Sequence, residues 1–344
     1  MPSSSTRALV AASAACALLA TACGSSGSDA GEPASSTAAV ASTTTSSASS
    51  TPGTGGPGPG GSSTPTGATP TKAAIAYASE SPTQTLDLYL PEDTGDGPVP
   101  VVVLIHGGAF KMGDASMEAA HAAALVDEGI AAASVNYRLS GEAPFPAGAQ
   151  DVKAAVRWLR ANADTYGLDP DRIGAWGESA GGWMANMLGA TGDQATVFDD
   201  DALGTADQSD AVQAVVSWFG PSDFATMDEQ AKDSKCPSPD VHGTAASPES
   251  VWLGEAVDTS SLTAKTDLTS YVAKADALPA WYLAHGDTDC QVPGGQSAEM
   301  AAALEAEGAE VTYEVLEGAG HGDAAFESTQ LEPTVAFLVE QLGA

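Results

Sequence analysis

The pattern of hydrophobic and polar residues divides the chain into two unequal parts. Residues 24–72 consist almost wholly of Ser, Thr, Gly, Pro and Ala, and such a segment cannot bury enough apolar surface to offset the entropy of ordering it. Beyond them, short apolar runs alternate with stretches of helical spacing. We therefore expect a disordered linker over residues 23–72 and one folded domain over residues 73–344, which is long enough to bury a core.

The apolar runs of the domain predict strands that alternate with helices. Residues 85–90 alternate polar and apolar side chains, which is typical of a half-buried strand, and residues 101–105 are apolar throughout, which is typical of a strand covered on both faces. Further strands are expected at residues 130–137, 173–176, 212–218, 280–284 and 310–316, and helices at residues 117–128, 151–163, 296–307 and 331–342. This order predicts an α/β fold, a mostly parallel twisted sheet with helices on both faces, whose ligands lie at the carboxyl ends of the strands.

One segment interrupts this alternation. Residues 221–277 are acidic, contain Pro and Ser, and hold only weak helical pieces such as residues 248–253. Because the segment falls between two core strands, we expect it to form a cap insertion over the active edge of the sheet. A long surface loop far from the site is the alternative.

The beginning of the chain has the composition of an export signal. Arg7 precedes an apolar run at residues 8–20, which is too short to span a bilayer. The small residues directly before Cys23 resemble a bacterial lipobox, so residues 1–22 are expected to be a lipoprotein signal peptide and Cys23 the lipidated residue. An ordinary cleaved signal, with Cys23 incidental, is the alternative. We expect an extracytoplasmic protein anchored to the cell membrane by lipid, with release from the cell as a second possibility.

Charge and cysteine content agree with that compartment. The chain has 45 acidic and 12 basic residues and a net charge of −33, which argues against nucleic-acid partners and against electrostatic adhesion to anionic lipid. Cys16 would leave with the signal and Cys23 would carry lipid, so only Cys236 and Cys290 remain, with one possible pairing. We expect a disulfide between them; two buried thiols are the alternative.

The candidate nucleophile lies in the sequence Gly177-Glu178-Ser179-Ala180-Gly181. An expected strand precedes this G-x-S-x-G pattern and an expected helix follows it, which is the context in which a serine hydroxyl is exposed on a sharp turn. In a chain this rich in Gly and Ser, chance gives roughly 0.4 matches to such a five-residue pattern, so a glycine-rich turn with a surface serine is the alternative. The assignment of Ser179 depends on its partners.

A serine nucleophile needs a base, and the chain has five histidines. His321 follows the last expected strand, on a loop from which an imidazole can reach over the sheet edge, and is the candidate base. His106 and His285 each end a strand just before a glycine, where imidazole more often supports a loop. His121 falls on a helix and His242 in the cap insertion.

Two acids compete to orient this base, and glycines offer donors for the substrate oxygen. Asp287 lies in a tight turn, where Asp commonly caps backbone N–H groups, whereas Asp289 lies farther out, within reach of an imidazole. We therefore choose Asp289. Backbone N–H groups of Gly107, Gly108 and Ala180 are expected to form an oxyanion hole, since glycine lets the backbone approach the substrate closely.

Together these motifs resemble the α/β-hydrolase superfamily. Within it the chain is similar to the acetyl esterase/lipase group with an H-G-G oxyanion motif, including the xylan deacetylase and feruloyl esterase-like (BD-FAE-like) branch, over about residues 80–343. The motifs that carry the resemblance are residues 106–108, 169–173, 177–182, 285–289 and 320–322. The resemblance places the triad on Ser179, Asp289 and His321. Ala109 stands where many relatives have a third glycine, with little loss expected because the donor is a backbone N–H.

The expected function is that of a lipid-anchored serine carboxylesterase, which hydrolyses short-chain, acetyl-type esters through an acyl-enzyme. The ester would be a small molecule or linked to polysaccharide, the latter by family analogy alone. A serine peptidase of the same fold and a non-catalytic binding lipoprotein are the alternatives. We expect no cofactor, and no metal because no His, Cys and carboxylate set occurs at ligand spacing; the oligomeric state stays open.

Overall fold

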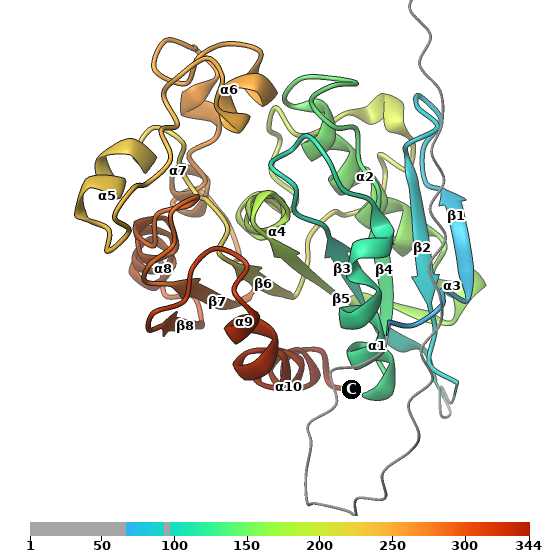
Figure 1. Ribbon diagram of the computed structural model, residues 1–344. Coiled ribbons are helices and arrows are strands. Elements are labelled where there is room, and N and C mark those ends of the chain that lie inside the picture. The colour runs from blue at the N-terminus through green and yellow to red at the C-terminus, as the bar shows by residue number, and fades with distance from the viewer. Residues whose placement is uncertain (1–66, 93–96) are drawn as a thin grey trace, which may run out of the picture. The chain divides into compact units, whose positions relative to one another are not determined.

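The computed structural model describes residues 67–92 and 97–344 (Figure 1). The predicted signal peptide, Cys23 and most of the predicted linker lie outside these residues. The end of the linker belongs to the domain, because the Ala68 N–H donates to the Ala119 carbonyl at 2.9 Å and Lys72 begins the first strand. The predicted boundary is therefore too late by several residues, since a segment held by backbone hydrogen bonds leaves no mark on composition.

The described residues form one sheet in the order β1-β2-β4-β3-β5-β6-β7-β8. β1 pairs antiparallel with β2, and β2 with β4, whereas the other neighbours are parallel. The strands are β1 (Lys72–Ala76), β2 (Thr85–Tyr89), β3 (Val99–Ile105), β4 (Ala131–Val135), β5 (Leu168–Glu178), β6 (Ala214–Trp218), β7 (Ala280–Gly286) and β8 (Val311–Leu316). The mostly parallel sheet that the apolar runs predict is thus present, with an antiparallel edge.

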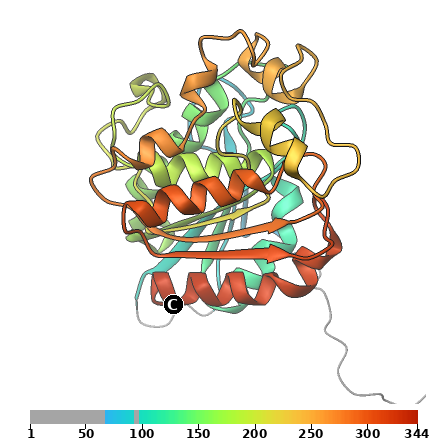
Figure 2. The same ribbon diagram turned by 90° about the vertical axis from the view of Figure 1, so that its left-hand side faces the viewer.

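Helices cover both faces of this sheet, as Figure 2 shows. Along β3, Val101 and Val103 pack into one core and Val102 and Leu104 into another, because successive side chains of a strand point to opposite faces. The first core also takes side chains from α2 (Ala147–Ala161), α4 (Ala180–Thr191) and α8 (Gly295–Ala306), and the second from α1 (Ala119–Asp127) and α10 (Leu331–Leu342). Shorter helices are η1 (Ala115–Glu118), α3 (Ala163–Tyr166), η2 (Asp201–Leu203) and α9 (Ala324–Thr329).

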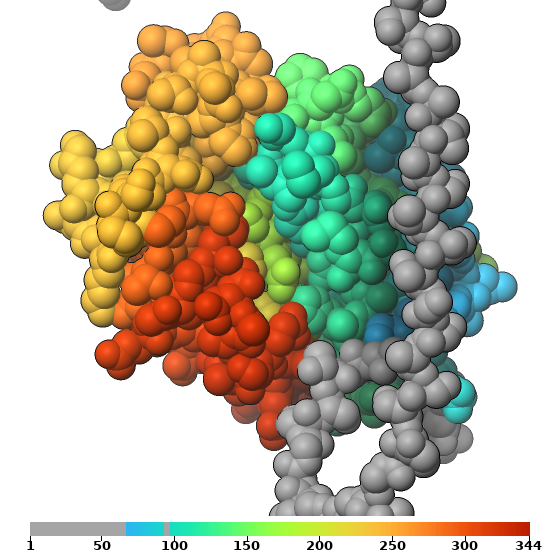
Figure 3. All heavy atoms as spheres, viewed as in Figure 1, coloured from blue at the N-terminus to red at the C-terminus, as the bar shows by residue number. Residues whose placement is uncertain are grey.

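The segment of residues 221–277, called the cap segment below, holds short helices. These are α5 (Met227–Asp233), α6 (Pro248–Leu253), η3 (Thr263–Lys265) and α7 (Thr269–Val272). Ser247 caps α6 by accepting from the Ser250 N–H. Figure 3 shows the cap segment, coloured yellow to orange, packed against the C-terminal part of the domain. Trp252 of α6 stacks on Phe110, with ring centroids 4.0 Å apart, and meets Trp183 of α4 edge-on.

Several short elements, among them β1, η2 and α9, have no counterpart among the predicted ones. β1 is an edge strand with mostly exposed side chains, so it lacks the alternation by which a half-buried strand is found. α9 has only six residues and depends on its Asp323 cap. No helix within the described parts of the chain is both long enough and apolar enough to cross a membrane.

Candidate active site

The backbone at Ser179 turns sharply from β5 into α4. Ser179 has φ 53° and ψ −119°, a region that residues with a side chain rarely adopt. The flanking glycines make the turn possible: a Cβ atom on Gly177 would lie 2.0 Å from the Gly181 carbonyl oxygen, and one on Gly181 would lie 1.9 Å from that of Ile105. Close backbone packing therefore requires the two glycines of the G-x-S-x-G pattern. A glycine-rich turn on the surface, which is the alternative, would not require them.

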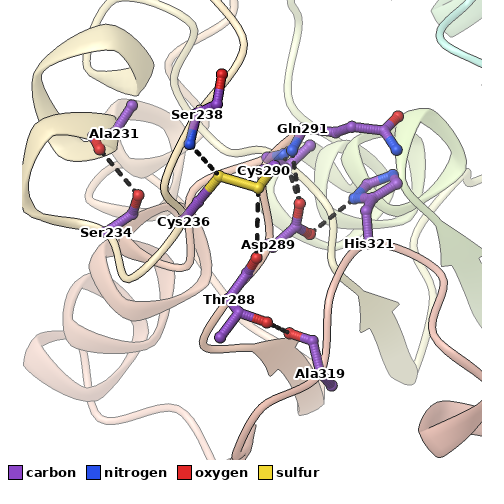
Figure 4. Close-up of a disulfide and its surroundings, with 11 residues drawn as sticks. Ala231, Ser234, Cys236, Ser238, Thr288, Asp289, Cys290, Gln291, Ala319 and His321 are labelled. Atoms are coloured by element: carbon purple, nitrogen blue, oxygen red, sulfur yellow. Dashed lines mark hydrogen bonds and ion pairs between the residues drawn. A yellow bond between two sulfur atoms is a disulfide. The ribbon is translucent and has the colours of Figure 1, made fainter.

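The structure brings the three predicted triad residues together. The Ser179 hydroxyl lies 2.8 Å from Nε2 of His321, and Nδ1 of His321 lies 2.7 Å from Oδ2 of Asp289. Asp289 is 2 % exposed, and its Oδ1 accepts from the backbone N–H groups of Gln291 and Val292. Figure 4 shows the Asp289 carboxylate between these N–H groups and the His321 ring.

The charge of Asp289 fixes the proton positions in this chain of hydrogen bonds. Burial alone would raise the pKa of Asp289, but hydrogen bonds from His285 and His321 outweigh it and hold the pKa well below its usual range. The ionised carboxylate accepts from Nδ1 of His321, so Nε2 carries the lone pair that faces the Ser179 hydroxyl. This arrangement can take the hydroxyl proton as the oxygen attacks.

The competing acid and the other histidines have different contacts. Asp287 accepts from the Gly318 N–H at 2.7 Å and pairs with Lys235, which is the backbone-capping role that its place in a tight turn suggests. The hydrogen-bond partners of the remaining imidazoles are the Gly107 carbonyl for His106, Ser297 and Val292 for His285, and Glu118 and Glu327 for His121, while His242 pairs with Glu249. His285 also faces Asp289 at 3.4 Å, but it is His321 that contacts Ser179. Asp289 and His321 are therefore the acid and imidazole that meet at Ser179.

The predicted oxyanion donors lie on the two segments that flank Ser179. Gly107 lies against the nucleophile, since a Cβ atom there would be 3.0 Å from the Glu178 carbonyl oxygen and 3.3 Å from the Ser179 Cβ. In the parts of the chain that the structure describes, the N–H groups of Gly107 and Gly108 donate no backbone hydrogen bond. Ala180 is the first residue of α4, where a helix leaves its N–H without a partner. Among the described residues, these three N–H groups are therefore the candidate donors to a substrate oxygen.

The turn after Gly108 is strained and is held by packing. Gly108, Ala109 and Phe110 have φ values of 109°, 57° and 58°, so a glycine at position 109 would suit the backbone better than Ala does. The Phe110 ring is 2 % exposed and stacked on Trp252 of the cap segment. The cap segment and the oxyanion turn, residues 107–110, therefore support each other.

A disulfide joins the cap segment to the loop that carries Asp289. Cys236 and Cys290 are bonded, with Cα atoms 5.3 Å apart, and the Asp240 N–H donates to the Cys290 carbonyl at 2.8 Å. Since Cys290 directly follows Asp289, the bond lies one residue from the carboxylate that holds His321 (Figure 4). The cap segment is thus tied to the site at two points, here and at Phe110.

Sequence spacing does not reveal a partly buried ion cluster next to the nucleophile. His121 on α1 lies 2.8 Å from Glu118, 2.9 Å from Glu327 and 3.6 Å from Glu178. Burial alone would lower the pKa of His121, but its hydrogen bonds to Glu118 and Glu327 raise it well above its usual value. Burial raises the pKa of Glu178 to about 7. These residues come from distant parts of the chain, so only the fold brings them together.

This cluster also contains a possible set of metal ligands that sequence spacing does not indicate. Ligand atoms of His121, Glu178 and Glu327 lie within 4.8 Å of one another. Both ring nitrogens of His121 already face carboxylate oxygens of Glu118 and Glu327, so a metal would have to displace hydrogen bonds from a protonated ring. We interpret the group as an ion cluster that joins α1, the end of β5 and α9.

The sequence of this site matches that of a known protein family. Residues 86–304 match the BD-FAE family model. The chain belongs to the BD-FAE family. The matched residues include the oxyanion turn, Ser179 and Asp289, and they end before His321. The contact of His321 with Ser179 and Asp289 is known from the structure. The chain has the α/β-hydrolase fold. Its family, the order of its sheet, the insertion after β6 and its likeness in fold to a solved carbohydrate esterase all agree with this assignment.

Several proteins named as esterases are similar to this BD-FAE chain. Esterase LipC of Mycobacterium tuberculosis is 26 % identical over 268 residues, covering 76 % of this chain and 63 % of LipC. Esterase LipQ of the same organism is 31 % identical over 252 residues, covering 72 % of this chain and 56 % of LipQ. The chain thus spans less than two thirds of these curated relatives. A solved "truncated form of carbohydrate esterase from gut microbiota" has a TM-score of 0.69 and 30 % identity, and the match covers 79 % of this chain and 96 % of that one.

Proposed function

We propose that this protein is a serine carboxylesterase with Ser179 as nucleophile, His321 as base and Asp289 as the acid that orients the base. The observation that carries the proposal is the continuous hydrogen-bonded chain from Ser179 through His321 to Asp289, at 2.8 and 2.7 Å. Membership of the BD-FAE family and likeness to proteins named as esterases support it.

The geometry leads to a two-step reaction. Ser179 Oγ attacks the acyl carbon while its proton moves to Nε2 of His321, and the carbonyl electron pair moves onto the substrate oxygen. The N–H groups of Gly107, Gly108 and Ala180 would stabilise that oxyanion. The alcohol leaves as the tetrahedral intermediate collapses and takes the proton back from His321. Water then attacks the acyl-enzyme by the same route, releasing the acid and restoring the serine.

We propose a short acyl group, of the acetyl type. Aromatic side chains of the oxyanion turn, α4 and the cap segment, namely Phe110, Trp183 and Trp252, are fully buried against one another. Because the cap segment is held there by stacking and near Asp289 by a disulfide, a long acyl chain would have to displace packed rings. The likeness to a carbohydrate esterase supports an ester carried on a carbohydrate.

We also propose that the protein acts outside the cytoplasm, held by lipid on Cys23. The Cys236–Cys290 disulfide supports this location, since structural disulfides persist in oxidising compartments. The short apolar run before Cys23 and the small residues next to it are the features on which the lipid anchor rests.

A panel of chromogenic esters, from acetate to octanoate, together with peptide anilides tests the chemistry. We expect turnover of the short esters, and Ser179→Ala or His321→Ala should lower kcat by at least about 10³-fold without a change in thermal stability. Asp289→Asn should also lower kcat strongly, whereas Asp287→Asn, its matched control two residues away, should leave the rate near that of the unchanged protein. Anilide cleavage without ester cleavage, or a rate that survives Ser179→Ala, would contradict the proposal.

A further inference from the structure

The polar contacts of the site continue beyond Asp289 into the core. His285, the sixth residue of β7, is 1 % exposed. Its Nε2 lies 2.9 Å from the Val292 carbonyl oxygen and 3.4 Å from Oδ2 of Asp289, while its Nδ1 lies 2.7 Å from the hydroxyl of Ser297. Ser297 lies on α8 and is also 1 % exposed. A second imidazole therefore faces the same carboxylate oxygen that accepts from His321.

The contacts of His285 define where its proton lies. Nε2 faces a carbonyl oxygen and a carboxylate oxygen, which can only accept, so Nε2 carries the hydrogen. Nδ1 then has a lone pair and accepts from the Ser297 hydroxyl. Ser297 thus determines the tautomer of His285 in the same way that Asp289 determines the tautomer of His321.

The surroundings of Asp289 give this second imidazole a position among the donors of the carboxylate. The carboxylate is buried, and a buried anion is stable only when its lone pairs are occupied by donors. Oδ1 takes the N–H groups of Gln291 and Val292, and Oδ2 takes His321. The remaining donor that faces Oδ2 is His285. Among the described residues, His285 and His321 are the charged or titratable groups that contact this carboxylate.

We propose that His285 is a positioning residue that, aligned by Ser297, orients the Asp289 carboxylate and keeps it ionised for His321. The working unit is then a chain of five side chains, Ser297, His285, Asp289, His321 and Ser179. This inference rests on the proposed function, because it assigns a role in the same reaction. It predicts an effect on the basicity of His321, which a residue that only supports the loop would not have.

The sign of that effect follows from charge. An N–H donor to Asp289 withdraws part of the negative charge that the imidazolium of His321 experiences. Removal of the donor leaves a stronger negative field at the ring of His321, which favours its imidazolium form. Because the base must be neutral to act, the acid limb of the pH dependence of kcat/KM should move to higher pH.

The decisive comparison is His285→Leu against His285→Gln in the full chain, with a short-chain chromogenic ester as substrate. Both variants lose the ring, but only glutamine keeps an N–H donor that can reach Asp289. We expect kcat of the Leu variant to fall about 10- to 100-fold with KM nearly unchanged, and its acid limb to move up by about half a pH unit. The Gln variant should keep kcat within about fivefold of the unchanged protein and its acid limb in place.

Ser297→Ala tests the same chain through one hydroxyl, so it keeps the proposal testable if a position-285 variant does not fold. Its kcat should fall about three- to tenfold with KM unchanged. Ser134→Ala is its matched control. Ser134, on β4, is also fully buried, and its hydroxyl donates one hydrogen bond, to the carbonyl of Ala115 in η1. The control should keep kcat unchanged even if it loses comparable stability.

Two results would overturn the inference while leaving the proposed function intact. One is equal loss of kcat in the Leu and Gln variants with an unmoved acid limb, which would make His285 a support for the Val292 loop only. The other is Ser297→Ala with kcat no lower than that of Ser134→Ala. Failure of the proposed function has a different signature, since ester turnover would then be absent or would survive Ser179→Ala.

Discussion

The conformation of Ser179 is maintained by neighbours that have no side chain. Its positive φ costs about 1–3 kcal/mol in isolation, and it persists because β5 and α4 are packed on either side. A strand that ended without this turn would place the hydroxyl in the sheet, away from His321. The strain at one residue is thus part of how the fold presents its nucleophile.

Gly181→Ala should therefore disrupt the turn. The new Cβ would lie 1.9 Å from the Ile105 carbonyl oxygen and 2.8 Å from that of His106. Either the first turn of α4 or the backbone at the end of β3 would therefore have to move. We expect the free energy of unfolding to fall by at least about 2 kcal/mol and ester turnover to be lost. Gly141→Ala is the matched control, because nothing lies within 4 Å of its added Cβ. Denaturant unfolding of both variants measures the difference; equal stabilities would contradict the role given to Gly181.

Among the elements, the ion cluster connects the nucleophile strand to the helix that follows the base. Glu178 ends β5, His121 lies on α1 and Glu327 on α9, which begins three residues after His321. His121 also packs against the rings of Trp176 and Trp218. The cluster therefore fixes α9, and with it the loop of the base, against the strand that carries the nucleophile.

Glu178 makes the stability of this connection depend on pH. Burial raises its pKa from an ordinary 4.5 to about 7, so the folded chain binds this proton more tightly than the unfolded chain does. The stabilisation is complete below pH 4.5 and is lost as the pH rises through 7. Glu178→Gln, which imitates the protonated form, should match the unchanged protein near pH 4.5 and exceed its free energy of unfolding at pH 8 by about 1–3 kcal/mol.

Denaturant unfolding at the two pH values checks this expectation. Glu305→Gln, which replaces an exposed carboxyl on α8, is the control and should change the free energy of unfolding little at either pH. A Glu178→Gln variant that is less stable than the unchanged protein at pH 8 would mean that the ionised carboxylate stabilises His121 by more than its burial costs.

The elements also show which parts of the fold were predictable. The parallel strands β3 to β8 follow from apolar runs, because a strand buried on both faces must be apolar. β1 and α9 do not, since an exposed edge strand and a six-residue helix leave no periodic signal. The triad could be inferred because each member follows its own strand, and the carboxyl ends of parallel strands share one edge. The choice between Asp287 and Asp289 rested on position in the turn, and their separate partners, Gly318 and His321, are visible only in the folded chain.

The contacts around His121 and His285 lay beyond sequence reasoning for a different reason. Each depends on partners from other elements, such as Glu327 for His121 and Ser297 for His285, and the sequence around either histidine does not specify which side chain will face it. Local position alone identifies His121 as a helix residue and His285 as a support for a loop. Long-range packing, which no local pattern encodes, determines what they contact.

At the scale of the whole molecule, the net charge opposes attachment to a membrane and the proposed lipid favours it. A net charge of −33 repels the chain from an anionic membrane surface, so only the proposed lipid on Cys23 would hold it there. Each buried methylene of an acyl chain contributes about 0.8 kcal/mol, and stable anchoring needs more than one chain. A high-salt wash should therefore not release the protein, because the attachment is apolar.

Cys23→Ala should abolish lipid attachment, whereas Cys16→Ala, a second cysteine in the same export segment, should leave it unchanged. Cells that express each chain are fed a labelled fatty acid, and the protein is then partitioned between detergent and water. The unchanged protein and the Cys16→Ala variant should carry label and enter the detergent phase, and their mature chains should begin at Cys23 with added lipid mass. The Cys23→Ala variant should carry no label, because Cys16 lies within the apolar run and not directly after the small residues of the lipobox. Label in that variant would show that another residue carries the lipid. An unlabelled mature chain that begins elsewhere in the unchanged protein would show that Cys23 is incidental and that the acidic domain is released into solution.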